Sequence, residues 1–131
     1  MYTLVRNLGL ASLLSACVMT GAGPSEGSFK GILIDKMCSS KADLRITPNG
    51  LEGGMIVAEA HERECLLMPA CIKSGYGVLT FSDHKFLAFD AEGNRQALAA
   101  IKASKKLVDF EVEVSGDLNG ETLRVKTLKL Q

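Results

Sequence analysis

The alternation of side chains near the C-terminus constrains the fold of this chain more than any other feature of its sequence. Apolar residues at positions 108, 110, 112 and 114 alternate with acidic residues at 109, 111 and 113. This period of two predicts a β-strand with one buried face. Asn119-Gly120 follows, a pair that favours a tight hairpin turn because both residues tolerate positive φ. We therefore expect the chain to end in an antiparallel hairpin.

The register of that hairpin can be predicted by counting outward from the turn. A turn centred on Asn119-Gly120 places Val114 opposite Val125 and Glu113 opposite Lys126. An apolar pair and an acid–base pair of this kind both stabilise neighbouring strands. Beyond Lys126 the apolar positions shift in phase to 128 and 130, which indicates a β-bulge or a barrel corner.

The remaining elements are read from apolar spacing and from Gly and Pro positions. We expect a strand over residues 29–35, a long loop over 39–54, a helix over 55–67 that Pro69 interrupts, and a short continuation ending near Gly75. Two strands over 76–81 and 85–89 flank a turn at 82–84, and a helix covers 94–104.

The order of these elements defines a fold class. The sequence predicts a β-rich α+β domain, a small OB-like five-stranded barrel over residues 29–131. A helical insertion separates strands 1 and 2, and a helix separates strands 3 and 4, as in OB barrels. The connection between strands 1 and 2 is long and holds most of the cysteines.

The first residues have the pattern of an export signal. Arg6 precedes a short apolar run over 8–14, which is too short to span a bilayer. The sequence Leu14-Ser15-Ala16-Cys17 resembles the lipobox of bacterial lipoproteins. An ordinary secretory signal with an incidental Cys17 is the alternative.

The lipobox resemblance implies a signal peptide over residues 1–16, lipidation of Cys17 and a flexible tether over 17–28 that is rich in small and polar residues. Two or more acyl chains on one cysteine anchor a protein stably to a membrane. The residue after the cysteine is Val18 rather than Asp, which in lipoproteins favours the outer membrane, facing the periplasm. The expected partner is thus the membrane of the cell envelope, held through Cys17.

The charge balance argues against one class of partner. The chain has 15 basic and 15 acidic residues, so no excess of positive charge is present to neutralise phosphates. We therefore do not expect nucleic acid as a partner.

A second resemblance extends over the folded part. The segment from Gly31 to Asp35-Lys36-Met37-Cys38, followed by His61, Cys65, Cys71 and Ser74-Gly75, is similar to a group of small exported bacterial domains whose function is uncharacterised. The resemblance supports the fold rather than an activity.

The cysteines offer a first functional hypothesis. If Cys17 carries lipid, then Cys38, Cys65 and Cys71 remain, and an odd number cannot all pair within the chain. Export favours disulfides. A bond from Cys38 to Cys65 or Cys71 would staple the insertion to the first strand and stabilise the fold by roughly 3–4 kcal/mol. A bond between Cys65 and Cys71 would close only a small loop.

A metal site is the alternative. His61 and Cys65 are four residues apart and would share one face of a helix. A chain reversal at Pro69 could bring Cys71 beside them, and Cys38 would complete a Cys₃His site. Zinc suits such tetrahedral ligation and copper(I) suits thiolates. A thiolate–imidazole pair of Cys65 and His61 would instead make a thiol-dependent enzyme.

The sequence thus favours a lipid-anchored cell-envelope binding or interaction module with a disulfide-stapled insertion. No catalytic residue and no cofactor are assigned to it, and its protein or small-ligand partner is not specified by the sequence. A metal-binding envelope protein that holds zinc or copper through Cys38, His61, Cys65 and Cys71 is the first alternative, and the thiol-dependent enzyme is the second.

Overall fold

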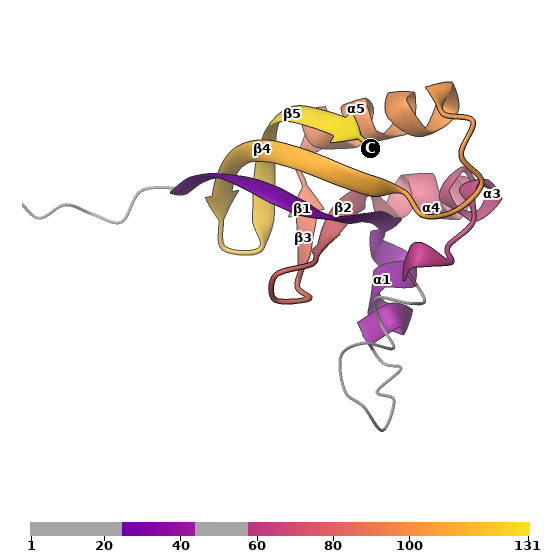
Figure 1. Ribbon diagram of the computed structural model, residues 1–131, viewed down its shortest axis with the longest axis horizontal. Helices are drawn as coiled ribbons and strands as arrows, with labels where there is room; N and C mark the ends of the chain where they lie inside the picture. The colour runs from indigo at the N-terminus through magenta and orange to yellow at the C-terminus, as the bar shows by residue number, and fades with distance from the viewer. Residues whose placement is uncertain (1–24, 44–57) are drawn as a thin grey trace, which may run out of the picture.

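The computed structural model describes residues 25–43 and 58–131, with the side chains of 41–43 left out (Figure 1). The lipobox, Cys17 and most of the expected long loop lie outside these residues. Of the helices in the described ranges, none combines the length and the apolar character needed to cross a bilayer.

Five strands form a closed barrel, which confirms the predicted small OB-like α+β fold. They are β1 (Ser25–Asp35), β2 (Tyr76–Thr80), β3 (Phe86–Phe89), β4 (Glu111–Asn119) and β5 (Thr122–Leu130), in the spatial order β1-β2-β3-β5-β4. Neighbouring strands are antiparallel except β3 and β5, which pair in parallel.

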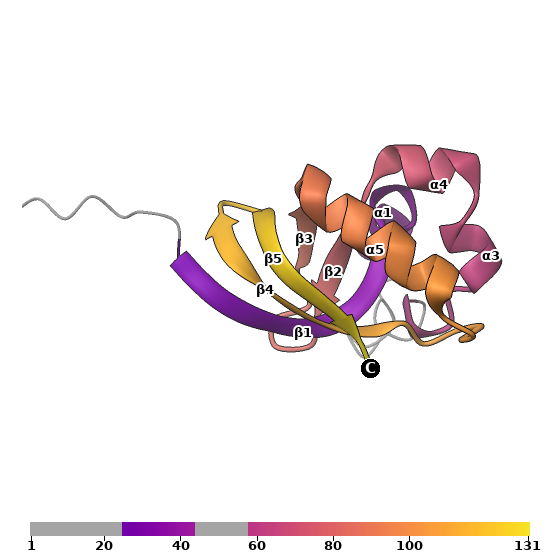
Figure 2. The ribbon, with the colours of Figure 1, turned by 90° about the horizontal axis from the view of Figure 1, so that it is seen from above.

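The helices lie where the order of elements predicts them. α1 (Lys36–Asp43), α3 (Arg63–Leu66) and α4 (Pro69–Ser74) belong to the insertion between β1 and β2, and α5 (Ala91–Ala103) connects β3 to β4. Figures 1 and 2 show the helices of the insertion gathered at one end of the barrel, while α5 packs against β5, β2 and β3.

The first strand is buried on both faces over its second half. Leu33 belongs to the main core with residues of the other strands and of α5, whereas Ile32 and Ile34 pack with Ala58 and Leu79 in a second, smaller cluster. Residues 31–35 are all buried, because the barrel interior covers one face and the insertion covers the other. A strand covered on both sides is continuously apolar rather than alternating.

Several predicted boundaries are corrected by the structure. β1 begins at Ser25 rather than Phe29, because residues 25–28 of the expected tether pair with β4. α1 replaces the start of the loop expected over 39–54. β4 begins at Glu111, since Asp109 has a φ of 58° that no regular strand accommodates.

The helix expected over 55–67 is broken. Ala58 and Glu59 are helical, but His61 and Glu62 are not, and Glu62 is extended at the N-cap of α3 with φ −83° and ψ 148°. The prediction that His61 and Cys65 share one helix face is therefore wrong.

The C-terminal hairpin exists in a different register. Asn119 pairs with Thr122, so the turn consists of Gly120 and Glu121, and Gly120 has a φ of 63°. Val114 consequently faces Leu128, and Glu113 faces Lys129, instead of Val125 and Lys126. The predicted bulge is confirmed, because the register shifts between Ser115 and Gly116.

Candidate functional site

Asp35 is the last residue of β1, and it is buried completely although it carries a carboxylate. The backbone N–H of Cys38 donates a hydrogen bond of 2.9 Å to Asp35 Oδ1. An acceptor three residues before the donor is the arrangement of a helix N-cap, so Asp35 ends the strand and begins α1. This cap fixes Cys38 in the first turn of α1, beside the carboxylate.

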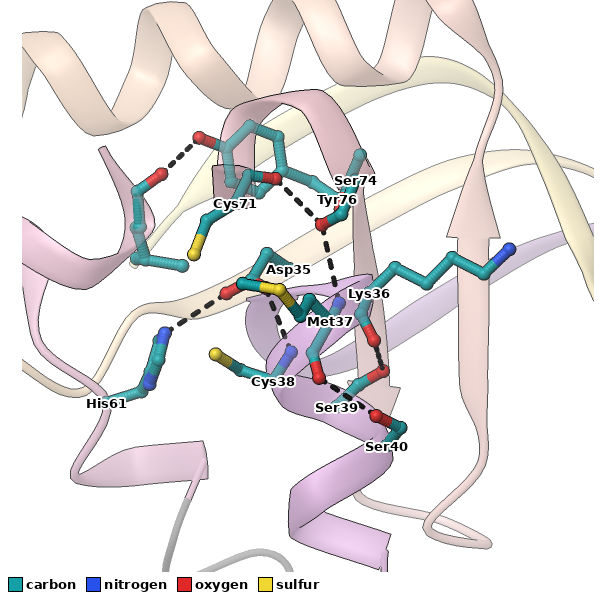
Figure 3. Close-up of polar contacts among 12 residues, drawn as sticks. Asp35, Lys36, Met37, Cys38, Ser39, Ser40, His61, Cys71, Ser74 and Tyr76 are labelled. Carbon is teal, nitrogen blue, oxygen red and sulfur yellow. Dashed lines mark hydrogen bonds and ion pairs between the residues drawn. The ribbon is translucent and has the colours of Figure 1, made fainter. Parts of the chain in front are cut away.

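The end of α4 is tied to the beginning of α1. Ser74 Oγ donates to the carbonyl of Cys71 at 2.8 Å and accepts from the backbone N–H of Met37 at 3.3 Å. The N–H of Lys36 donates to the carbonyl of Gly75 at 2.8 Å. These bonds dock α4 on α1 and turn Cys71, which is buried, toward the end of β1 (Figure 3). The Ser74-Gly75 pair of the sequence motif thus has a structural role.

Asp35, Cys38 and Cys71 form one cluster. A carboxylate oxygen and the two Sγ atoms all lie within 4.8 Å of one another. Figure 3 shows the two thiols and the carboxylate converging from the strand end, α1 and α4. The three cysteines of the described part of the chain, at positions 38, 65 and 71, are free thiols in the structure.

His61 approaches the same carboxylate from the side of the insertion. Its Nε2 lies 3.1 Å from Asp35 Oδ2, and its side chain is 12% exposed. The backbone turn at Ala58–His61, closed by a hydrogen bond from His61 N to Ala58 O of 3.1 Å, places the ring there. Both oxygens of the buried carboxylate therefore have a hydrogen-bond partner.

Of the four site residues predicted from the sequence, Cys38 and Cys71 belong to the cluster, His61 contacts its carboxylate, and Cys65 is not part of it. It lies in α3, partly exposed, and the group of converging ligand atoms contains Asp35 in its place. Asp35 belongs to the motif from Gly31 to Cys38, but the sequence alone assigned it no role. An available signal was its position, since an acidic residue that ends a continuous apolar strand and precedes a cysteine by three residues is placed to cap a helix beside that thiol.

The cluster keeps its carboxylate ionised and its thiols protonated. Burial opposes the ionisation of Asp35, but the hydrogen bonds from His61 and from the N–H of Cys38 outweigh it and hold the pKa of Asp35 below its usual value. Burial and then the charge of Asp35 raise the pKa of Cys38 to about 12, and the same two causes raise the pKa of Cys71.

These directions make Cys38 and Cys71 poorly suited to act as nucleophiles. A nucleophilic cysteine needs a lowered pKa and access to substrate. Cys38 has a raised pKa, and Cys71 is 2% exposed with a raised pKa. Instead, two sulfur atoms and one carboxylate oxygen, all of which can ligate a metal ion, converge within 4.8 Å of one another.

A surface groove lies on the other side of α1. It has a volume of about 840 Å³, and its lining includes Lys36, Met37 and Ser40 from α1 and His84 and Phe86 from the barrel. Cys38 is not part of that lining. The cluster and the groove therefore use different faces of the same short helix.

Comparison of this chain with models of known protein families, with curated proteins and with solved structures found no match in any of the three. A functional proposal consequently rests on the geometry and the chemistry of the cluster.

Proposed function

We propose that this protein binds a zinc ion through Asp35, Cys38 and Cys71, in a domain that lipidation of Cys17 anchors to the cell envelope. The observation that carries the proposal is the convergence of two thiols and a buried carboxylate within 4.8 Å of one another. The proposal keeps the metal-binding alternative from the sequence, with Cys38 and Cys71 as ligands, but puts Asp35 in the place of His61 and Cys65.

The spacing of the three atoms suits a tetrahedral ion. With Zn–S bonds of about 2.3 Å and Zn–O bonds of about 2.1 Å, neighbouring ligand atoms of a zinc site are roughly 3.5–3.8 Å apart. Ligand atoms that already lie within 4.8 Å need only a small contraction to reach this geometry. The site is therefore largely formed before the ion arrives.

The ligand types favour zinc over copper(I). Copper(I) is best served by thiolates and thioethers alone, whereas zinc accepts sulfur, nitrogen and carboxylate oxygen together. The oxygen at this site belongs to Asp35, which has no exposed surface and whose second oxygen is bound by His61.

His61 supports the proposed ligand. A histidine that holds the free oxygen of a ligating carboxylate orients it and tunes its charge, and such partners commonly matter ten- to a hundredfold, as an order of magnitude, for metal affinity. Nε2 of His61 at 3.1 Å from Asp35 Oδ2 is in this position. We therefore assign His61 as a positioning residue of the site.

The disulfide-stapled binding module is the second candidate, and the same sulfur atoms favour it. A bond between Cys38 and Cys71 would join α1 to α4 and close the insertion on the end of β1. Among the pairings that the sequence leaves open, this one is supported by the two Sγ atoms, which lie within 4.8 Å of each other.

Metal analysis of the purified protein tests the zinc proposal. The full chain, expressed with its N-terminal segment and purified in detergent under reducing conditions, should carry about one zinc per chain by mass spectrometry of the metal content. Cys38→Ser and Cys71→Ser should lose the ion, while Cys65→Ser, the matched control, should keep it. Metal-free wild type after zinc addition and dialysis, or an equal loss in Cys65→Ser, would refute the assignment.

The envelope anchor needs a separate test. Labelled palmitate fed to cells that express the full chain should be incorporated into the protein, and Cys17→Ser should abolish the label and release the protein from the membrane fraction. A Cys17→Ser variant that stays labelled would exclude lipidation at this cysteine.

A further inference from the structure

We propose that the cluster is a redox-controlled metal site, in which the reduced Cys38 and Cys71 hold zinc and their oxidation to a disulfide expels it. The inference rests on the proposed zinc binding and adds its regulation. It makes the two candidate functions two states of one site.

The distance between the sulfur atoms of Cys38 and Cys71 allows either the zinc-bound state or the disulfide state without a large backbone change. A disulfide needs its sulfur atoms about 2.05 Å apart, and a zinc dithiolate needs them roughly 3.8 Å apart. The Sγ atoms of Cys38 and Cys71 lie within 4.8 Å of each other as free thiols. Rotation of the two side chains and a slight approach of α1 and α4 can therefore bring the sulfur atoms to the separation that either state needs.

The two states exclude each other. A zinc ligand must be a thiolate with a free electron pair and its charge, and the sulfur of a disulfide has given up that charge to the S–S bond. Once Cys38 and Cys71 are bonded, Asp35 alone of the proposed ligands remains, and one carboxylate does not hold zinc. Disulfide formation thus releases the ion rather than weakening its binding slightly.

The scaffold around the cysteines does not depend on either state. The cap from Asp35 Oδ1 to Cys38 N, the bond from Lys36 N to the carbonyl of Gly75, and the contact of His61 with Asp35 involve no sulfur atom. These bonds can persist through oxidation, so the change is expected to be reversible and confined to the site.

Burial sets the order of the chemical steps. Cys38 is partly exposed, while Cys71 is 2% exposed, so a disulfide-bearing oxidant reaches Cys38 first. In the zinc-loaded protein the ion holds Cys38 as a thiolate, and this thiolate attacks one sulfur of the oxidant, forms a mixed disulfide and expels one thiolate. The Cys71 thiolate then attacks the Sγ of Cys38 and expels the second thiolate. Two protein thiolates are oxidised to the disulfide, the oxidant disulfide is reduced to two thiolates, and the zinc ion leaves.

Cys65 provides the specificity test. It lies in α3, outside the converging group, and the extended backbone of Met68 separates α3 from α4, which begins at Pro69 and carries Cys71. The structure therefore predicts that oxidation links Cys38 to Cys71 and leaves Cys65 free. In the sequence, however, Cys65 is nearer than Cys38 to Cys71.

The experiment treats the zinc-loaded full chain with oxidised glutathione and follows three quantities. A chromogenic chelator measures released zinc, alkylation counts the remaining thiols, and peptide mapping identifies the bond. We expect one zinc released per disulfide formed, loss of two thiols, a Cys38–Cys71 linkage, and full recovery of zinc binding after reduction. Cys65→Ser should behave like the wild type.

The outcomes separate this inference from the zinc proposal. A reduced protein that binds no zinc overturns both. A reduced protein that binds zinc but forms no Cys38–Cys71 disulfide, or that links Cys65 instead, overturns the redox control alone. The same holds if zinc stays bound after the Cys38–Cys71 disulfide has formed.

Discussion

The side chain of Asp35 makes two hydrogen-bond contacts and, in our proposal, also binds the zinc ion. One oxygen caps α1 by accepting from Cys38 N, and the other contacts His61 Nε2. The proposed zinc ion would use the remaining lone pairs of the same carboxylate. The cap needs only an oxygen acceptor, whereas the metal needs the negative charge, so two substitutions can separate these roles.

Asp35→Asn should keep the cap and weaken the binding of zinc. Asn caps helices about as well as Asp, whereas Ala costs about 1 kcal/mol at such a position. Both variants should bind zinc at least about tenfold more weakly. In urea unfolding with a chelator present, Asp35→Ala should be about 1 kcal/mol less stable than Asp35→Asn. Equal stability of the two variants would show that the cap contributes nothing, and unchanged zinc affinity in Asp35→Asn would remove the carboxylate from the site.

Residue types alone drew attention to three of the four side chains that the structure brings together at the end of β1. Cysteine and histidine are rare enough in the chain to be noticed, with four and two copies, and Cys38, Cys71 and His61 do converge on Asp35. Asp35 was not assigned because acidic residues are frequent and most are solvated. Cys65 was assigned because the expected helix carried it on one face with His61, and this shared face is absent because Glu62 is extended.

At the scale of elements, the pairing of β1 with β2 decides where Asp35 lies. Gly31 faces Thr80 and Asp35 faces Tyr76 in this ladder. A Cβ added at Gly31 would lie 2.0 Å from the carbonyl oxygen of Leu79, which belongs to the β2 backbone. Backbone cannot give way as a side chain can, so the ladder requires glycine at this position.

Gly31→Ala should therefore destabilise the protein by about 2–3 kcal/mol or more, as overpacking against a rigid neighbour does. Gly27→Ala on the same strand is the matched control, because its Cβ would meet only the ring of Phe29, at 3.2 Å, and that ring can rotate. Thermal unfolding of both variants in the same buffer measures the difference. If Gly31→Ala unfolds at the same temperature as Gly27→Ala, β1 and β2 can separate at little cost in free energy.

The elements themselves were predictable where local pattern determines them. Period two predicted β4, the Asn119-Gly120 turn signal predicted β5 as its hairpin partner, and the apolar run predicted the buried half of β1. The register of the hairpin was not predictable from Asn119-Gly120, because the structure uses Gly120-Glu121 as the turn. Helix breaks in the insertion depend on tertiary contacts, such as the bond of 2.7 Å from Arg63 N to the carbonyl of Leu107, which no local period reveals.

At the scale of the whole molecule, closure of the barrel depends on its shortest seam. β3 and β5 pair in parallel through Ala88 with Thr122 and Phe89 with Leu123. The side chain of Asp90 extends this seam, since its Oδ1 accepts from Val125 N at 3.1 Å and from Gly93 N at 3.0 Å. One carboxylate thus caps α5 and holds β5 to the end of β3. The order of elements predicted a barrel, but this seam is too short to leave a pattern in the sequence.

Asp90→Ala should open this seam. Loss of the cap costs about 1 kcal/mol, and the unpaired N–H of the buried Val125 adds about 1–3 kcal/mol, so the free energy of unfolding should fall by about 2–4 kcal/mol. Asp90→Asn retains an oxygen acceptor and should lose less than half of that. Hydrogen exchange at Val125 should accelerate strongly in the Ala variant and only slightly in the Asn variant. If the two variants show the same hydrogen-exchange rate at Val125 and the same free energy of unfolding, the apolar core rather than Asp90 closes the barrel. The pairing of β3 with β5 would then be a consequence of barrel closure and not its cause.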